Sequence, residues 1–133
     1  MDEKFFVPFD TAKLLKENGY DTKVSFYYTT DGVLKSHAAF NMEALDGEPC
    51  LSDYSNSDLQ KWYREENYIA APTYHEVLDW LEKKGYPIES ACLRDFDGHD
   101  IMWVCGCDIH VSGIYPTREE AFNDVILDLL NIL

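Results

Sequence analysis

The sequence predicts an α+β fold, in which an antiparallel sheet of two Asp-Gly β-hairpins packs with about three helices. Two observations lead to this fold class. Signals that begin and end helices recur in nearly the same form along the chain, and an Asp-Gly pair lies twice between two runs of alternating residues. The resulting order is helix, strand, strand, repeated once after a connecting segment and followed by a last helix. We therefore expect a pseudo-repeat of the form αββ-αββ-α.

The helix starts are the most regular of these signals. Thr73 is followed three residues later by Glu76, and Thr117 by Glu120. This is the capping box, in which the Thr hydroxyl accepts a hydrogen bond from the Glu amide and the carboxylate accepts one from the Thr amide. An earlier helix is expected to begin with Asp10 as its cap. The inward-facing positions of that helix are expected to be Ala12, Leu14 and Leu15.

The first two helices in chain order are expected to end in the same way. Gly19-Tyr20 and Gly85-Tyr86 follow the last periodic positions. Glycine adopts the left-handed conformation that closes a helix, and the aromatic residue after it can fold back on the last turn. Both helices are therefore expected to stop at the glycine.

Each of these helices is followed by a hairpin signal. The alternating runs are 24–29 and 33–40 around Asp31-Gly32, and 88–96 and 101–111 around Asp97-Gly98. Asp-Gly suits a two-residue type I′ turn, which needs two residues that tolerate positive φ. On the last run, one face is expected to hold Ile101, Trp103, Cys105, Cys107, Ile109 and Val111.

An acidic and aromatic segment, residues 41–70, connects the two halves. Its Ser57-Asp58-Leu59-Gln60 pattern is another capping box and predicts a short helix over Asp58–Glu66. Four aromatic residues gather in this segment: Tyr54, Trp62, Tyr63 and Tyr68. They form either a surface for a basic or amphipathic partner or the anchors that pack a long connection onto the fold. No low-complexity linker divides the chain, so a single domain over 1–133 is expected.

Charge limits the classes of partner. The chain has 133 residues, 11 Lys and Arg against 25 Asp and Glu, and a formal net charge of −14. Such a surface repels phosphates, which argues against direct binding to nucleic acid or to an anionic membrane. Three interpretations stay open: solubility alone, a basic protein partner, or mimicry of a polyanion.

The chain carries no sign of export or membrane insertion. Its first residues, Met1–Pro8, are acidic with a short apolar run, unlike a signal peptide, and no stretch approaches the ~20 apolar residues of a membrane span. We therefore expect a cytoplasmic protein. Its thiols are expected to be reduced, although their even number also allows two disulfides. They belong to Cys50, Cys92, Cys105 and Cys107.

The strongest candidate for chemistry is Cys105-Gly106-Cys107-Asp108-Ile109-His110, with Cys92 or His99 as a further metal ligand. Strand alternation argues against a metal site, because it places both cysteines on the apolar face and His110 on the other. We expect core cysteines, with no metal and no cofactor. A Cys/His enzyme stays an alternative, although no catalytic motif supports it. The acidic stretch 95–100 is expected to be a hairpin tip rather than a calcium loop.

The chain also resembles a group of proteins through caps, stops and core positions spread over most of its length. These are Phe6-Val7-Pro8-Phe9, Leu14-Leu15-Lys16-Glu17, Gly19-Tyr20, Ala71-Pro72-Thr73-Tyr74, Asp79-Trp80-Leu81 and the run from Tyr115 to Ala121. The group comprises small, uncharacterised proteins from genomes of gut Bacteroidetes, often found with prophage or other mobile elements. The resemblance implies a similar fold and a mobile-element setting. It implies no activity, because that group has no established one.

Together these observations favour a non-catalytic interaction or accessory protein of a mobile element. The alternatives are an acidic DNA mimic that inhibits a nucleic-acid-binding host protein, and a small Cys/His enzyme. The C-terminal helix adds a further possibility. Its apolar stripe, which includes Leu127 and ends in Leu129–Leu133, suits either burial between layers or formation of a homo-oligomer.

Overall fold

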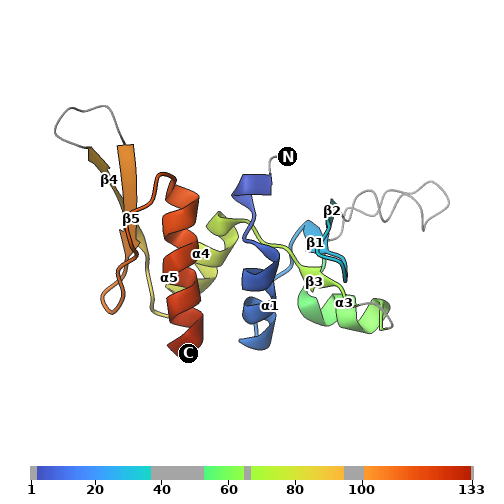
Figure 1. Ribbon diagram of the computed structural model, residues 1–133. Coiled ribbons are helices and arrows are strands. Elements are labelled where there is room, and N and C mark those ends of the chain that lie inside the picture. Colours follow the sequence, from blue (N-terminus) through green and yellow to red (C-terminus); the bar gives the residue numbers. More distant parts are fainter. Residues whose placement is uncertain (1–2, 37–52, 65–66, 95–100, 133) are drawn as a thin grey trace. The chain divides into compact units, whose positions relative to one another are not determined.

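The computed structural model describes residues 3–36, 53–64, 67–94 and 101–132. These residues form an α+β structure with four α-helices and two small antiparallel sheets, one of three strands and one of two (Figure 1). The sequence predicts one sheet, whereas the described strands form two. Contacts between residues divide the chain into two compact units, Met1–Pro72 and Thr73–Leu133. The single domain stays a prediction, and each unit is considered below by itself.

The first unit combines a small sheet with two helices. Its elements are a 3-10 helix Glu3–Phe5, α1 Phe9–Glu17, β1 Phe26–Tyr28, β2 Leu34–Ser36, α3 Asn56–Trp62 and β3 Ile69–Ala70. β1 lies in the middle and pairs antiparallel with both neighbours, with Tyr27 opposite Lys35 on one side and Ala70 on the other. Helix α1 packs near β3, and its Ala12 and Leu15 are fully buried as predicted, whereas Leu14 is only partly covered.

The start of α1 differs from the prediction. The helix begins at Phe9 after Pro8, whose backbone is extended, and no side chain caps it. Asp10 lies inside the first turn, so its assignment as the cap is wrong. The amide of Val7 donates to the carbonyl of Pro72 at 3.1 Å, and the Val7 side chain is fully buried. Contacts of this kind, distant in sequence, fix the entry into α1 without a side-chain cap.

The ends of α1 and α4 confirm the predicted glycine stops. Gly19 and Gly85 have φ values of 85° and 97°. In both cases the following Tyr amide donates to the carbonyl five residues earlier at 2.9 Å, and the Gly amide donates to the carbonyl three residues earlier at 3.0–3.1 Å. This pair of bonds is the Schellman motif, which satisfies carbonyls that a helix end leaves open.

The turn between β1 and β2 is one residue longer than the two-residue Asp-Gly type I′ turn that the sequence predicts. The Gly32 amide donates to the Thr29 carbonyl and the Thr29 amide to the Val33 carbonyl, both at 2.9 Å. Gly32 has φ 81°, and no described residue other than glycine has positive φ, so Asp31 does not take the left-handed conformation of a type I′ turn. The geometry is that of a three-residue loop with Gly in the left-handed position. Asp97-Gly98, together with the whole stretch 95–100, lies outside the described residues.

Helix α3, Asn56–Trp62, begins two residues earlier than predicted. Its capping box joins Ser55 and Asp58, with the Ser55 hydroxyl accepting from the Asp58 amide at 3.2 Å and the Asp58 carboxylate accepting from the Ser55 amide at 2.9 Å. The hydrogen bond from the Ser55 backbone lowers the pKa of Asp58. Ser57 instead hydrogen-bonds through its amide and hydroxyl to Asp21. The box predicted at Ser57 is therefore wrong, because that hydroxyl is used in a contact distant in sequence.

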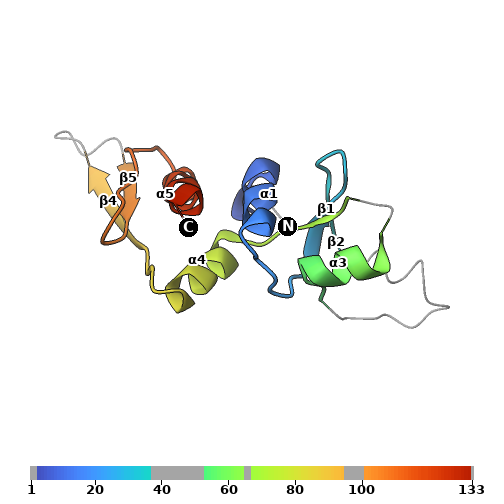
Figure 2. The ribbon, with the colours of Figure 1, turned by 90° about the horizontal axis from the view of Figure 1, so that it is seen from below.

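The second unit packs a hairpin against a long helix. Its elements are α4 Tyr74–Lys83, β4 Glu89–Arg94, β5 Ile101–Gly106 and α5 Arg118–Ile132. The capping box at Thr73 and Glu76 is confirmed, with both reciprocal bonds present. At α5, the Thr117 hydroxyl accepts from the Glu120 amide at 3.2 Å, as predicted. Figures 1 and 2 show α5 alongside β5, and the two elements are in contact.

The apolar stripe of α5 is buried in part. The buried side chains are Ala121, Phe122, Val125, Ile126, Leu129 and Leu130. Tyr74 at the start of α4 packs near Phe122, with 6.4 Å between the ring centroids. Leu127 is only half-buried and Ile132 is 55% exposed, so burial holds for part of the predicted stripe. Self-association through this helix stays a prediction.

Candidate protein-binding surface

The chain turns back on itself directly after β5. The Cys107 amide donates to the His110 carbonyl at 2.8 Å, and Gly106 then pairs with Val111 across an antiparallel bridge. Farther along, Trp103 and Tyr115 exchange backbone hydrogen bonds of 2.7 and 2.9 Å. Residues 111–115, hereafter the return segment, therefore lie beside β5 as a third extended stretch. The prediction that one strand continues to Val111, with a single apolar face, is wrong.

One face of this three-stretch layer is directed at α5. Cys105 is buried, and its Sγ lies 4.0 Å from the carbonyl of Arg118 at the start of the helix. The Arg118 guanidinium lies 5.4 Å from the centre of the Trp103 ring. The Tyr115 hydroxyl donates to the Asp124 carboxylate at 2.8 Å, and this bond raises the pKa of Tyr115. These contacts define an inner face that α5 covers.

The return segment is held by side chains as well as by its backbone bridges. The buried Ser112 hydroxyl accepts from the Cys105 amide at 2.9 Å and donates to the Gly113 carbonyl at 2.6 Å. The Asp124 carboxylate also accepts from the Gly113 amide at 2.8 Å. The segment is thus tied to both β5 and α5, which gives the opposite face a fixed backbone.

The opposite face, hereafter the outer face, is apolar. Successive side chains alternate across an extended strand, and directly paired residues share a face. Because Trp103, Cys105 and Tyr115 face α5, the ladder positions that alternate with them and with their paired residues face away from it. The outer face is therefore made of Ala91 and Leu93 from β4, Met102 and Val104 from β5, and Val111 and Ile114 from the return segment.

Much of this outer face is open to solvent. Val111 is 68% exposed, Ile114 60% and Leu93 41%, while Met102 and Val104 are half-buried. Single exposed apolar side chains are ordinary on protein surfaces, but a contiguous set on one sheet face is typical of an interaction site.

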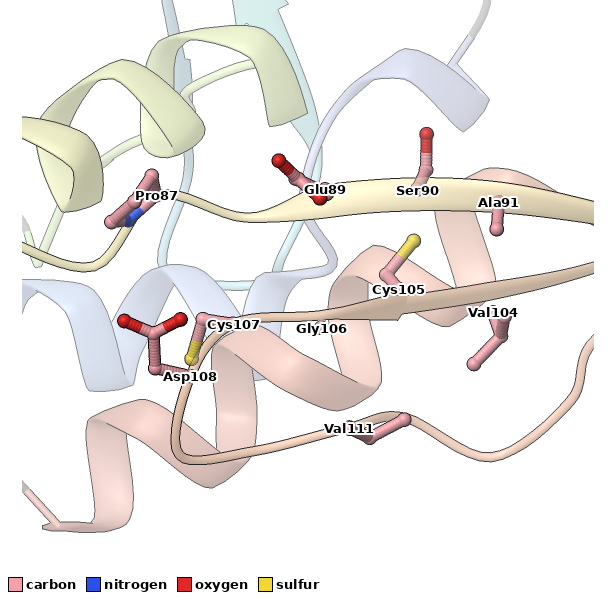
Figure 3. Close-up of a pocket in the computed structure, with 10 residues that line it drawn as sticks. All are labelled: Pro87, Glu89, Ser90, Ala91, Val104, Cys105, Gly106, Cys107, Asp108 and Val111. Atoms are coloured by element: carbon pink, nitrogen blue, oxygen red, sulfur yellow. The ribbon is translucent and has the colours of Figure 1, made fainter.

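A shallow pocket of about 400 Å³ opens on the outer face where β5 ends (Figure 3). Val104 and Val111 supply apolar walls, with the small residues Ala91 and Gly106 also in the lining. Glu89 from β4 and Asp108 from the turn after β5 bring two carboxylates, and both residues are exposed. Among the described residues that line the pocket there is no Lys, Arg or His. The described lining therefore combines apolar walls with negative charge.

The cysteines of the second unit differ in environment. Cys105 is a core residue, as predicted, and burial raises the pKa of its thiol to about 11, with Arg118 acting weakly in the opposite sense. A thiol with this pKa is protonated at neutral pH, and the thiolate is the form that attacks carbon or binds metal. Cys107 is half-buried in the turn beside the pocket rather than in the core, because β5 ends one residue earlier. Cys92 is exposed on β4.

The expected metal ligands do not converge in the part of the chain that the structure describes. There, no group of three His, Cys, Asp or Glu side chains is placed to hold a metal ion. The His110 Nδ1 instead lies 3.9 Å from the Asp128 carboxylate of α5. Cys50 and His99 lie outside the described residues.

The aromatic residues predicted as either a partner surface or anchors of the connecting segment lie in the first unit. Tyr54, Tyr63 and Tyr68 form a chain of ring contacts that continues to Tyr27, with centroid distances of 6.4, 5.7 and 5.0 Å. The backbone of Tyr54 also exchanges hydrogen bonds of 3.0 and 3.1 Å with Val24 of the segment before β1. These three tyrosines thus anchor the connecting segment to the sheet, one of the two predicted roles. Trp62 is 63% exposed, with the Lys61 Nζ 5.2 Å from its ring centre.

The sequence alone does not predict the outer face as a site. The sequence pattern of the return segment is a weak indication of a strand, because Gly113 interrupts the run from Val111 to Tyr115 and the pattern is typical of a loop. Only the bridges from Gly106 and Trp103 show that the run returns along β5.

Comparison with known proteins adds no relative: no family model matches the chain, and neither curated proteins nor solved structures include a match. Among the described helices, none combines the length and the apolar character needed to cross a bilayer.

Proposed function

We propose that this protein is a non-catalytic accessory protein that binds another protein through the outer face of its hairpin. The observation that carries the proposal is the exposure of Leu93, Val111 and Ile114 together on one rigidly tied face. Exposed, contiguous apolar surface is costly in water, and burial against a partner recovers roughly 25 cal/mol per Å² of apolar area.

Catalysis has less support than binding. Cys105 is the most enclosed of the thiols that the structure describes, and its raised pKa keeps it protonated at neutral pH. The described residues that line the pocket include two carboxylates and a half-buried thiol, and His is not among them. A binding role uses the exposed apolar residues of this face, whereas the His110 ring lies 3.9 Å from the Asp128 carboxylate of α5.

The proposed setting is the cytoplasm of a bacterium that carries a mobile element. This part of the proposal rests on the sequence resemblance and on the expected reduced thiols. We further propose that the chain is a pseudo-repeat of two αββ units. The boundary between the compact units, at Pro72 and Thr73, coincides with the start of the second αββ segment and supports this proposal.

A matched pair of substitutions tests the binding surface. Val111 on the outer face is 68% exposed and Val33 in the first unit is 51% exposed, so Val111→Asp and Val33→Asp make the same chemical change at two open positions. Tagged wild type and both variants would be used to capture partners from the native host. We expect a partner held by wild type and by Val33→Asp and lost from Val111→Asp. Equal retention by both variants, or equal loss, would contradict the proposal. Ile114→Asp is a second variant of the same face and should behave like Val111→Asp.

A further inference from the structure

The chemistry of the pocket narrows the kind of partner that fits the outer face. At one end of this face, Glu89 and Asp108 place carboxylates beside the apolar walls of Val104 and Val111. A side chain that fits both the apolar walls and the carboxylates has an apolar stem and a cationic end. Lys and Arg have this form, because their methylene stems pack on apolar surface while the charged group reaches acceptors.

The charge of the second unit points the same way. Residues 73–133 carry four Lys and Arg against twelve Asp and Glu, a net charge of −8. A field of this sign accelerates the approach of a cationic partner and repels an anionic one. It also disfavours a second copy of this chain, since each copy carries −14.

The shape of the face indicates the partner's secondary structure. The apolar face of a sheet is normally covered by a helix or by another sheet. The inner face of this hairpin is covered by α5, and the outer face presents the same three-stretch width without the helix. β5 is six residues long, or about 20 Å at the rise of a strand. A helix of about 13 residues spans the same distance.

We propose that the outer face binds a cationic amphipathic helix of a partner protein, whose Lys or Arg side chain enters the pocket between Glu89 and Asp108. The apolar stripe of that helix packs on Val104, Val111 and Ile114. This inference rests on the proposed function and adds the chemistry and secondary structure of the partner. The binding mode is that of a helix laid on an apolar surface, recognised through anchors one turn apart.

The test is a selection with a defined probe. A displayed library of 16-residue, helix-favouring random peptides is selected on the full-length protein and counter-selected on Val111→Asp. We expect the recovered peptides to share apolar residues at helical spacing and at least one Lys or Arg beside them. Recovery of acidic or uncharged peptides, or of none, overturns the inference. The proposed function is then judged separately by the capture from host extract, which assumes neither charge nor helix.

The affinity of a selected peptide for variants of the protein then shows whether its Lys or Arg side chain binds at Glu89 and Asp108. Glu89→Gln and Asp108→Asn should each weaken binding about two- to fivefold, the range expected for an exposed ion pair. Glu82→Gln and Asp79→Asn on α4 make the same changes in the same unit, and we expect affinities within about twofold of wild type. Equal losses from both pairs show that net charge alone is sensed and overturn the inference. A peptide whose Lys or Arg is replaced by Glu should bind better to Glu89→Lys than to wild type, and failure of this exchange also overturns it.

Self-association is measured by sedimentation of the wild type and of Val111→Asp. If sedimentation shows a wild-type dimer that Val111→Asp abolishes, the outer face is occupied by a second copy and the inference is wrong. A monomer that binds the selected peptide supports it.

Discussion

Ser112 makes a hydrogen bond on which the shape of the outer face depends. Its buried hydroxyl accepts from the Cys105 amide at 2.9 Å and donates to the Gly113 carbonyl at 2.6 Å. The bond to the amide ties the return segment to β5 at the point where Cys105 is completely enclosed. Ser112→Ala removes the acceptor and leaves the size of the side chain nearly unchanged.

The size of the stability loss in Ser112→Ala follows from the Cys105 amide, which loses its acceptor. A buried donor left unsatisfied costs about 1–3 kcal/mol, whereas an exposed one is satisfied by water. We therefore expect Ser112→Ala to lower the free energy of unfolding by about 2 kcal/mol. Ser25 is the matched control, because its hydroxyl donates to Asp53 at 2.9 Å in an exposed setting. Ser25→Ala should change stability by less than about 0.5 kcal/mol.

Two measurements check this prediction. Urea unfolding of both variants gives the difference in free energy, and hydrogen exchange of the Cys105 amide reports the local effect. We expect faster exchange of that amide in Ser112→Ala and weaker binding of any partner of the outer face. If Ser112→Ala and Ser25→Ala have equal stability and leave the Cys105 amide equally protected, the assigned role of the Ser112 hydroxyl is refuted.

Two further predictions concern a helix cap and a buried thiol. Thr73→Ala should cost about 1 kcal/mol in urea unfolding, because it removes the hydroxyl that accepts from the Glu76 amide at 3.2 Å; Thr73→Ser should keep most of that stability, and an equal loss from both variants would contradict the capping role. Burial raises the pKa of Cys105 to about 11 from 9.0, so the folded state favours the protonated thiol. The stability from this preference is present below pH 9 and is lost as the pH rises toward 11, so wild type should lose more stability than Cys105→Ala over this range. Parallel curves for the two proteins would show that Cys105 does not titrate in the expected way.

The features predicted correctly from sequence depend on a few neighbouring residues. The Thr73 capping box and the two Gly-Tyr stops are satisfied within one or two helical turns, so their hydrogen bonds need no partner distant in sequence. Burial of Ala12 and Leu15 likewise follows from helical periodicity.

The features predicted wrongly depend on contacts distant in sequence. Ser55 and Ser57 both begin a plausible cap, and the hydroxyl of Ser57 is taken by Asp21, 36 residues earlier. No local pattern shows that choice. Asp10 is not needed as a cap because the chain before α1 is fixed through Val7 and Pro72.

The candidate surface was missed for a related reason. An alternating run predicts a strand but not the residue at which the strand turns back, and here the turn follows Gly106. Because of this reversal, Val111 lies on the face opposite Cys105, and Ile114 lies on the same face as Val111. The aromatic residues expected to be either a partner surface or anchors of the connecting segment pack in part against one another, with Tyr63 between Tyr54 and Tyr68.

Photo-crosslinking in the native host tests the central claim most directly. The photoreactive residue p-benzoylphenylalanine is placed at Val111 in one variant and at Val33 in another, both exposed positions. We predict a discrete crosslinked protein from position 111 and none from position 33. Crosslinking from position 33 with none from position 111 would contradict a partner on the outer face.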